Sequence, residues 1–162
     1  MISARSLFYA LLLCCITAVS HAQQGGTHLN RATGSFEVKV VPQKPDNKPE
    51  EEAKLGRMSI DKVFQGGLEG TSKGEMLSLM TEVKGSGVYV AIERVTGTLH
   101  GRKGSFALHH TGLMLRNTPQ LSVTVVPDSG TDELVGLTGS MKINIEGGKH
   151  TYEFEYALLD KK

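Results

Sequence analysis

Apolar and polar residues alternate with a period of two through most of the chain after residue 35, which is typical of β-strands that bury one face. No segment of helical length shows the 3.6-residue period of an amphipathic helix. The short segment Asp132–Leu134 has room for one helical turn at most. The alternation predicts eight strands, at residues 36–40, 58–64, 76–81, 88–99, 105–112, 121–125, 141–146 and 152–158.

The predicted strands are separated mostly by short turns, and the chain has 19 glycines to form them. Parallel strands would need helical crossovers, so the sheet should be antiparallel. Closing such a sheet removes its unpaired edges, and about eight strands enclose a filled core or a small ligand cavity. The sequence therefore predicts an all-β protein, a closed antiparallel eight-stranded β-barrel, with a β-sandwich as the alternative.

The first 22 residues have the features of a signal peptide. Arg5 gives a positive start, residues 7–19 form an apolar run, and Ser20-His21-Ala22 provides small residues for cleavage near Ala22. We therefore expect an exported protein, periplasmic or secreted. Residues 23–33 should form a disordered N-terminal segment, and residues 34–162 a single barrel domain.

Processing at this site would remove both cysteines, Cys14 and Cys15, and leave a domain without thiol chemistry. It would also remove Arg5, which leaves 17 basic residues against 17 acidic ones. This balance argues against a nucleic-acid partner. A membrane-spanning barrel is disfavoured as well, because it needs aromatic girdles and the chain has no Trp.

The chain has no standard catalytic or cofactor-binding signature, so we expect no cofactor. His109 and His110 are adjacent, but neighbouring residues on a strand point to opposite faces. They could not bind one ion together without a bulge, and we expect no metal site.

Three ionisable residues fall on faces that should point into the barrel. Lys62 lies between Ile60 and Phe64, and His110 follows Phe106 and Leu108 at alternate positions. A buried charge is costly unless it is paired, so these groups imply mutual pairing or a wet cavity.

The third inward residue is either Glu93 or Arg94, because both faces of residues 88–95 are apolar. Alignment with Tyr89 and Ala91 favours Glu93 inside, which leaves Arg94 free to reach a partner outside. A carboxylate and an imidazole in a lumen suit proton transfer or the orientation of a polar ligand.

The same groups could instead form a hydrogen-bond network that fixes strand register, or Lys62 could extend to a barrel mouth. Tyr152 and Tyr156 are expected mainly as core rings, with Tyr156 kept as a ligand-binding candidate beside Tyr89. Met76, Met80 and Met141 could line an adaptable apolar cavity or simply pack.

An ordered series of motifs resembles a known family. It consists of Glu93–Leu99, Gly101-Arg102, Gly104–Leu108, His110-Thr111-Gly112, Val126-Pro127, Ser129-Gly130-Thr131 and Glu133–Gly139. From about Gly34 to Leu158 the chain is similar to an uncharacterised bacterial family, number 3224 of the domains of unknown function. The resemblance groups it with the allene-oxide-cyclase-like barrels, and it implies a closed eight-stranded barrel with an internal cavity.

Members of that wider group include isomerases and proteins that steer phenolic coupling, but none of their motifs can be placed on this chain residue by residue. A shared fold does not transfer a reaction. We therefore expect a module that binds a small, largely apolar molecule in its lumen, with Glu93 and His110 at its polar end. The alternatives are a cofactor-independent isomerase or cyclase that uses this pair, and a structural domain with a filled core. The sequence leaves the oligomeric state open.

Overall fold

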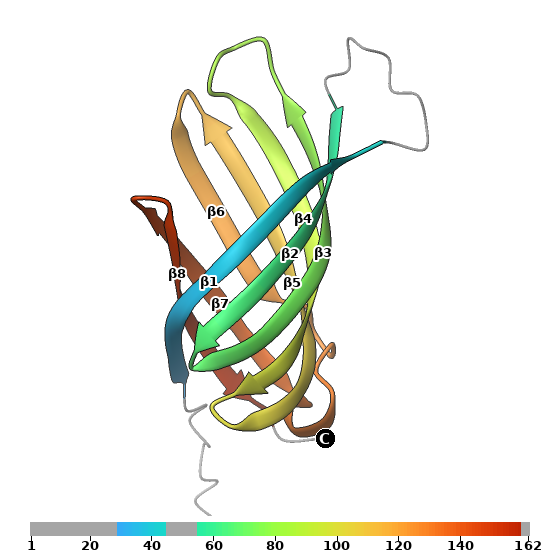
Figure 1. Cartoon of the computed structure of the whole chain (residues 1–162), viewed down its shortest axis with the longest axis vertical. Helices are drawn as coiled ribbons and strands as arrows, with labels where there is room; N and C mark the ends of the chain where they lie inside the picture. Colours follow the sequence, from blue (N-terminus) through green and yellow to red (C-terminus); the bar gives the residue numbers. More distant parts are fainter. Residues whose placement is uncertain (1–28, 45–54, 160–162) are drawn as a thin grey trace, which may run out of the picture.

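The computed structural model describes residues 29–44 and 55–159. The predicted signal peptide and its cysteines lie outside these residues. Eight strands and one turn of 3₁₀-helix make up the fold (Figure 1). They are β1 (Asn30–Gln43), β2 (Leu55–Gly66), β3 (Leu68–Met80), β4 (Gly87–Leu99), β5 (Arg102–Leu115), β6 (Thr118–Val125), η2 (Asp132–Leu134), β7 (Leu137–Glu146) and β8 (Lys149–Leu158).

The strands form one closed antiparallel barrel in sequence order, β1 to β8, which confirms the predicted fold class. Closure comes from β1, because residues 30–36 pair with β8 while residues 34–43 pair with β2. Strand β1 therefore starts at Asn30, inside the segment 23–33 that we expected to be disordered. The two-residue turns His100-Gly101 and Gly147-Gly148 have positive φ at both positions. This backbone conformation matches the twist of antiparallel hairpins.

The strands are longer than the alternation predicted, most clearly β3, which was expected only from Met76. Its inward positions Gly70, Ser72 and Gly74 carry little or no apolar side chain, so the period of two is hidden there. The single turn of 3₁₀-helix lies where one helical turn was expected.

The two ends of the barrel interior differ. At the end where β1 begins, which we call the closed end, large side chains fill the interior and η2 packs over them. The following side chains there are at most 1% exposed: Leu68, Leu99, Phe106, Leu134, Leu137, Tyr152 and Phe154. Phe106 and Phe154 stack with ring centroids 5.8 Å apart.

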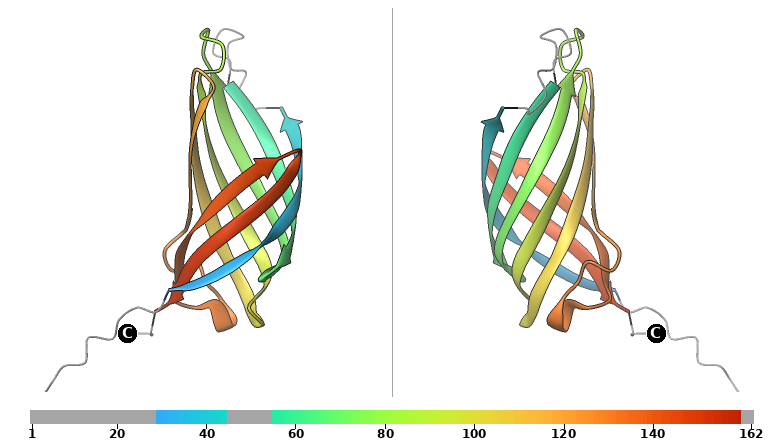
Figure 2. Two further views of the ribbon diagram at one scale, coloured as in Figure 1. Left: turned by 90° about the vertical axis from the view of Figure 1, so that its left-hand side faces the viewer. Right: turned by 90° about the vertical axis from the view of Figure 1, so that its right-hand side faces the viewer.

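At the opposite end, which we call the open end, apolar side chains face inward but remain accessible. Val40, Met80, Met114 and Leu121 occupy inward positions there and are 39–53% exposed. The tip of the β7–β8 hairpin lies below the tip of the β5–β6 hairpin (Figures 1 and 2). Within these strands, β6 and β7 share a single ladder pair, Thr124 with Ser140. The wall of the barrel is thus weakest on this side.

Candidate functional site

A cluster of polar side chains lies between the two halves of the interior, centred on Glu93 of β4. The period of two places Ala91, Glu93 and Val95 inside, and Arg94 outside. Glu93 is 1% exposed. The residue opposite it on β3 is Gly74, and a Cβ atom there would lie only 2.6 Å from the Cβ of Glu93. The glycine therefore lets β3 lie close to the backbone and Cβ of β4 at Glu93.

Three side chains from three other strands donate hydrogen bonds to the carboxylate or can do so. Nζ of Lys62 lies 2.8 Å from Oε1 of Glu93, and Nε2 of His110 lies 3.1 Å from the same oxygen. Oγ of Ser72 donates to Oε2 at 2.9 Å. Lys62, Glu93 and His110, the three inward ionisable residues predicted from the sequence, are thus in direct contact.

The surroundings of Glu93 act on its pKa in opposite directions. Burial raises the pKa, but the hydrogen bond from His110 and the charge and hydrogen bond of Lys62 lower it more, to about 2. Glu93 is therefore ionised at neutral pH. A carboxylate with so low a pKa is a weak general base, so any proton transfer here would use His110, with Glu93 as the group that orients it.

Lys62 is held from two sides. Its Nζ lies over the rings of Phe36 and Phe64, 5.0 Å and 5.8 Å from their centroids, while it pairs with Glu93. Rings in this position stabilise a cation electrostatically. The lysine, 6% exposed, is enclosed and does not extend to a barrel mouth.

The other predicted site residues take different places. Tyr89 faces inward at the open end, and its ring covers Gly112, where a Cβ would lie 2.0 Å from Cε1 of the tyrosine. Burial raises the pKa of Tyr89, and the negative charge of Glu93 raises it further. Arg94 is on the outside, where it donates to Ser105 Oγ at 3.2 Å.

Tyr156 does not join the cluster. It lies in the filled half, with its hydroxyl 2.8 Å from Nδ1 of His100 in the turn after β4. Its ring contacts Phe154 at a centroid distance of 5.4 Å. The structure therefore places this candidate in the packed core, as expected for a tyrosine whose hydroxyl finds a partner at the rim.

Comparison with known proteins gives a family but no activity. The model of a family described as "Protein of unknown function (DUF3224)" matches residues 32–156. The chain belongs to the DUF3224 family. A crystal structure of a DUF3224 protein of unknown function from Shewanella oneidensis MR-1 is 49% identical, with a TM-score of 0.77, and the match covers 82% of this chain and 100% of that one. No curated protein matches the chain.

Sequence reasoning missed two members of the cluster in this DUF3224 barrel, Ser72 and Gly74. Both occupy inward positions of β3, which continues the alternation from Leu68 to Met76. A period of two read through small residues as well as apolar ones would have placed both inside the barrel, on the strand that pairs with that of Glu93. Within the part of the chain that the structure describes, no fully buried side-chain nitrogen or oxygen lacks a hydrogen-bond partner.

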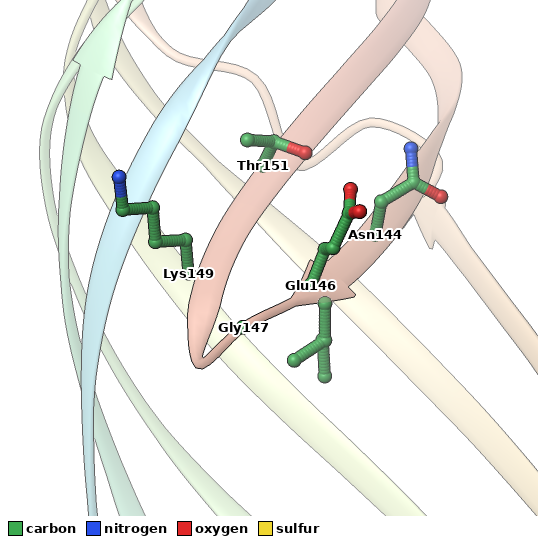
Figure 3. Close-up of a pocket in the computed structure, with 6 residues that line it drawn as sticks. Asn144, Glu146, Gly147, Lys149 and Thr151 are labelled. Carbon is green, nitrogen blue, oxygen red and sulfur yellow. The ribbon is translucent and has the colours of Figure 1, made fainter.

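Two surface pockets in the described part of the DUF3224 barrel do not include Glu93 in their lining. One, of about 760 Å³, is at the tip of the β7–β8 hairpin, with Asn144, Glu146, Lys149 and Thr151 around it (Figure 3). Another, of about 520 Å³, is lined mainly by outward residues of β3, β4 and β5, including Leu77 and exposed Ile92, and also by His110 of the cluster.

Over residues 29–44 and 55–159, no three His, Cys, Asp or Glu side chains are placed to hold a metal ion. The same residues contain no helix that is long and apolar enough to cross a membrane.

Proposed function

We propose that this DUF3224 protein binds a small, largely apolar molecule in the open half of its barrel, with the polar end of the molecule directed at the Glu93 cluster. One observation carries the proposal. Inward-facing apolar side chains are accessible at the open end, whereas the inward-facing side chains of the closed end are packed together and buried. Accessible apolar surface rimmed by a few polar groups is typical of ligand sites.

The lining suits an adaptable binding surface. Met58, Met76, Met80 and Met114 occupy inward positions on β2, β3 and β5 at this end. Methionine side chains are flexible and polarizable, and they fit ligands of different shapes. Tyr89 adds an aromatic ring beside them. The cluster beneath carries the polar groups that would fix one end of the ligand.

Binding can be tested with the apolar fluorescent probe N-phenyl-1-naphthylamine. Met76 and Leu77 are neighbours on β3, one directed inward and one outward. We expect Met76→Lys to weaken binding of the probe by about tenfold or more, because it places a charge on the apolar lining. The control Leu77→Lys should leave the dissociation constant within about twofold. Equal effects of both variants, or an effect of Leu77→Lys alone, would place the probe outside the barrel and contradict the proposal.

A second candidate function, a cofactor-independent isomerase, is supported by the contact between His110 and the ionised Glu93. Native mass spectrometry of protein purified from its own source would identify a co-purifying molecule. Chromatography of that molecule after incubation with the protein then separates the two functions. A binder returns it unchanged, whereas an isomerase converts it, and His110→Gln should slow the conversion by about 100-fold or more.

We also propose export, on the evidence of residues 1–22 alone. The positive start, the apolar run and the small residues before position 23 support it. Intact mass measurement of protein from the exported fraction should give a chain that starts at or near Gln23. A full-length chain retained in the cell would contradict this proposal without affecting the binding site.

A further inference from the structure

The two ring nitrogens of His110 have different environments. Nε2 contacts the Glu93 carboxylate at 3.1 Å. Nδ1 has no hydrogen-bond partner among residues 29–44 and 55–159, although the side chain is only 5% exposed. Because every fully buried side-chain nitrogen in this part of the chain has a partner, Nδ1 belongs to the small part of the ring that remains accessible.

The direction of the Nε2 hydrogen bond determines whether Nδ1 donates or accepts a hydrogen bond. An ionised carboxylate only accepts hydrogen bonds, so Nε2 carries the proton of this contact. In the neutral imidazole, Nδ1 then carries a lone pair and accepts. The accessible ring nitrogen of His110 is thus a hydrogen-bond acceptor in a largely apolar setting.

The charges of the cluster are balanced without a ligand. Lys62 is paired with Glu93 at 2.8 Å. The titratable groups that face inward around His110 are Glu93 and Tyr89 on β4, Lys62 on β2 and, towards the open end, His150 on β8. On β6, the position opposite His110 is the apolar Val123.

Between His110 and the open end, the described strands place no further charged side chain in the interior. Among the described strands, the inward positions on this side hold no Lys, Arg, Asp or Glu; they include Val38, Val40, Met58, Met76, Gly112, Met114, Leu121 and Ile143. A ligand anion would lie close to the ionised Glu93, and the nearest cation is already paired. Burial of such an uncompensated charge is strongly unfavourable.

We infer that the barrel selects neutral amphiphiles with one hydrogen-bond donor, a hydroxyl or N–H group that donates to Nδ1 of His110, and that it rejects apolar anions of the same size. The inference rests on the proposed binding function and names the ligand class for the same site.

The test compares three molecules with one naphthalene body, each used to displace N-phenyl-1-naphthylamine. They are 1-naphthol with a donor, 1-methoxynaphthalene without one, and 1-naphthoate with a negative charge. At about pH 7.5 we expect naphthol to bind about 3–10-fold more tightly than the methyl ether, the contribution of one hydrogen bond. Naphthoate should bind most weakly.

His110→Phe should remove the difference between naphthol and the ether. His110→Gln should keep part of it, because its amide oxygen still accepts. His109→Phe, on the outer face, is the matched control and should change nothing.

The outcomes separate this inference from the function on which it rests. If naphthoate binds more tightly than naphthol at about pH 7.5, or if His110→Phe leaves the preference for naphthol intact, the ligand class is wrong. Binding that is still lost in Met76→Lys but not in Leu77→Lys would then leave the proposed function standing. If the probe does not bind inside the barrel at all, both proposals fail.

Discussion

The closed and open halves of the barrel use the same strands and the same inward alternation, but they fill the interior differently. Leucines and aromatic rings occupy the closed half and are fully buried. Methionines and valines line the open half and remain partly accessible. The Glu93 cluster lies between the two halves. This difference indicates that the closed half stabilises the fold, which leaves the open half available for the ligand binding that we propose.

The difference between the two halves can be tested first by a substitution at the closed end. Phe154 is fully buried and stacks against Phe106. We expect Phe154→Ala to lower the free energy of unfolding by about 4 kcal/mol, because it leaves a cavity that the tight packing cannot close. The matched change at the open end is Met80→Ala, and it should cost less than about 1 kcal/mol. Urea denaturation measures both values. Equal losses would mean that the two halves contribute alike to stability.

The Glu93 cluster between the two halves can be disrupted by a substitution of Glu93 itself. Glu93→Gln removes the negative charge and leaves Lys62 buried without a counter-charge, so we expect a loss of about 3 kcal/mol in the free energy of unfolding. Adding Lys62→Met should restore part of this loss, since an apolar replacement of a buried ion pair is often tolerated. A double variant less stable than Glu93→Gln alone would show that Lys62 does not depend on the carboxylate.

Acid should lower the stability of the protein by protonating Glu93 in the same cluster. The pKa of Glu93 is lowered from 4.5 to about 2 by its partners, so its contribution is complete above about pH 4.5 and is lost as the pH falls towards 2. At 1.36 kcal/mol per pKa unit, roughly 2 kcal/mol should be lost between about pH 7 and pH 3. Urea denaturation across this range measures the loss. The free energy of unfolding should fall less steeply with decreasing pH in Glu93→Gln than in the unaltered protein. The same pH dependence in both proteins would mean that other groups cause the acid sensitivity.

The sequence predicts the position of a polar residue well where apolar residues flank it on the same face, and poorly where the face consists of small residues. The inward positions of Lys62 and His110 followed from the period of two, because each has apolar neighbours two residues away. Glu93 was only favoured over Arg94, because both faces of residues 88–95 are apolar. Ser72 and Gly74 complete the site but carry no apolar signal of their own. The accessibility of Met76 depends on its height in the barrel, which pattern alone cannot place.

The smallest expected difference comes from two glycines that each make room for a tyrosine. At Gly34 a Cβ would lie 1.9 Å from the backbone oxygen of Gln65 and 2.6 Å from the hydroxyl of Tyr152, whereas at Gly112 its three nearest atoms all belong to the Tyr89 ring. A backbone oxygen in a sheet cannot move aside, but a half-buried ring at the open end can rotate. Gly34→Ala should therefore cost about 1–2 kcal/mol more in the free energy of unfolding than Gly112→Ala. Only Gly112→Ala should change the affinity for N-phenyl-1-naphthylamine, because it moves Tyr89. Equal costs in urea denaturation, with unchanged affinity in both variants, would mean that the open half is as rigid as the closed one and has no room to adapt to a ligand.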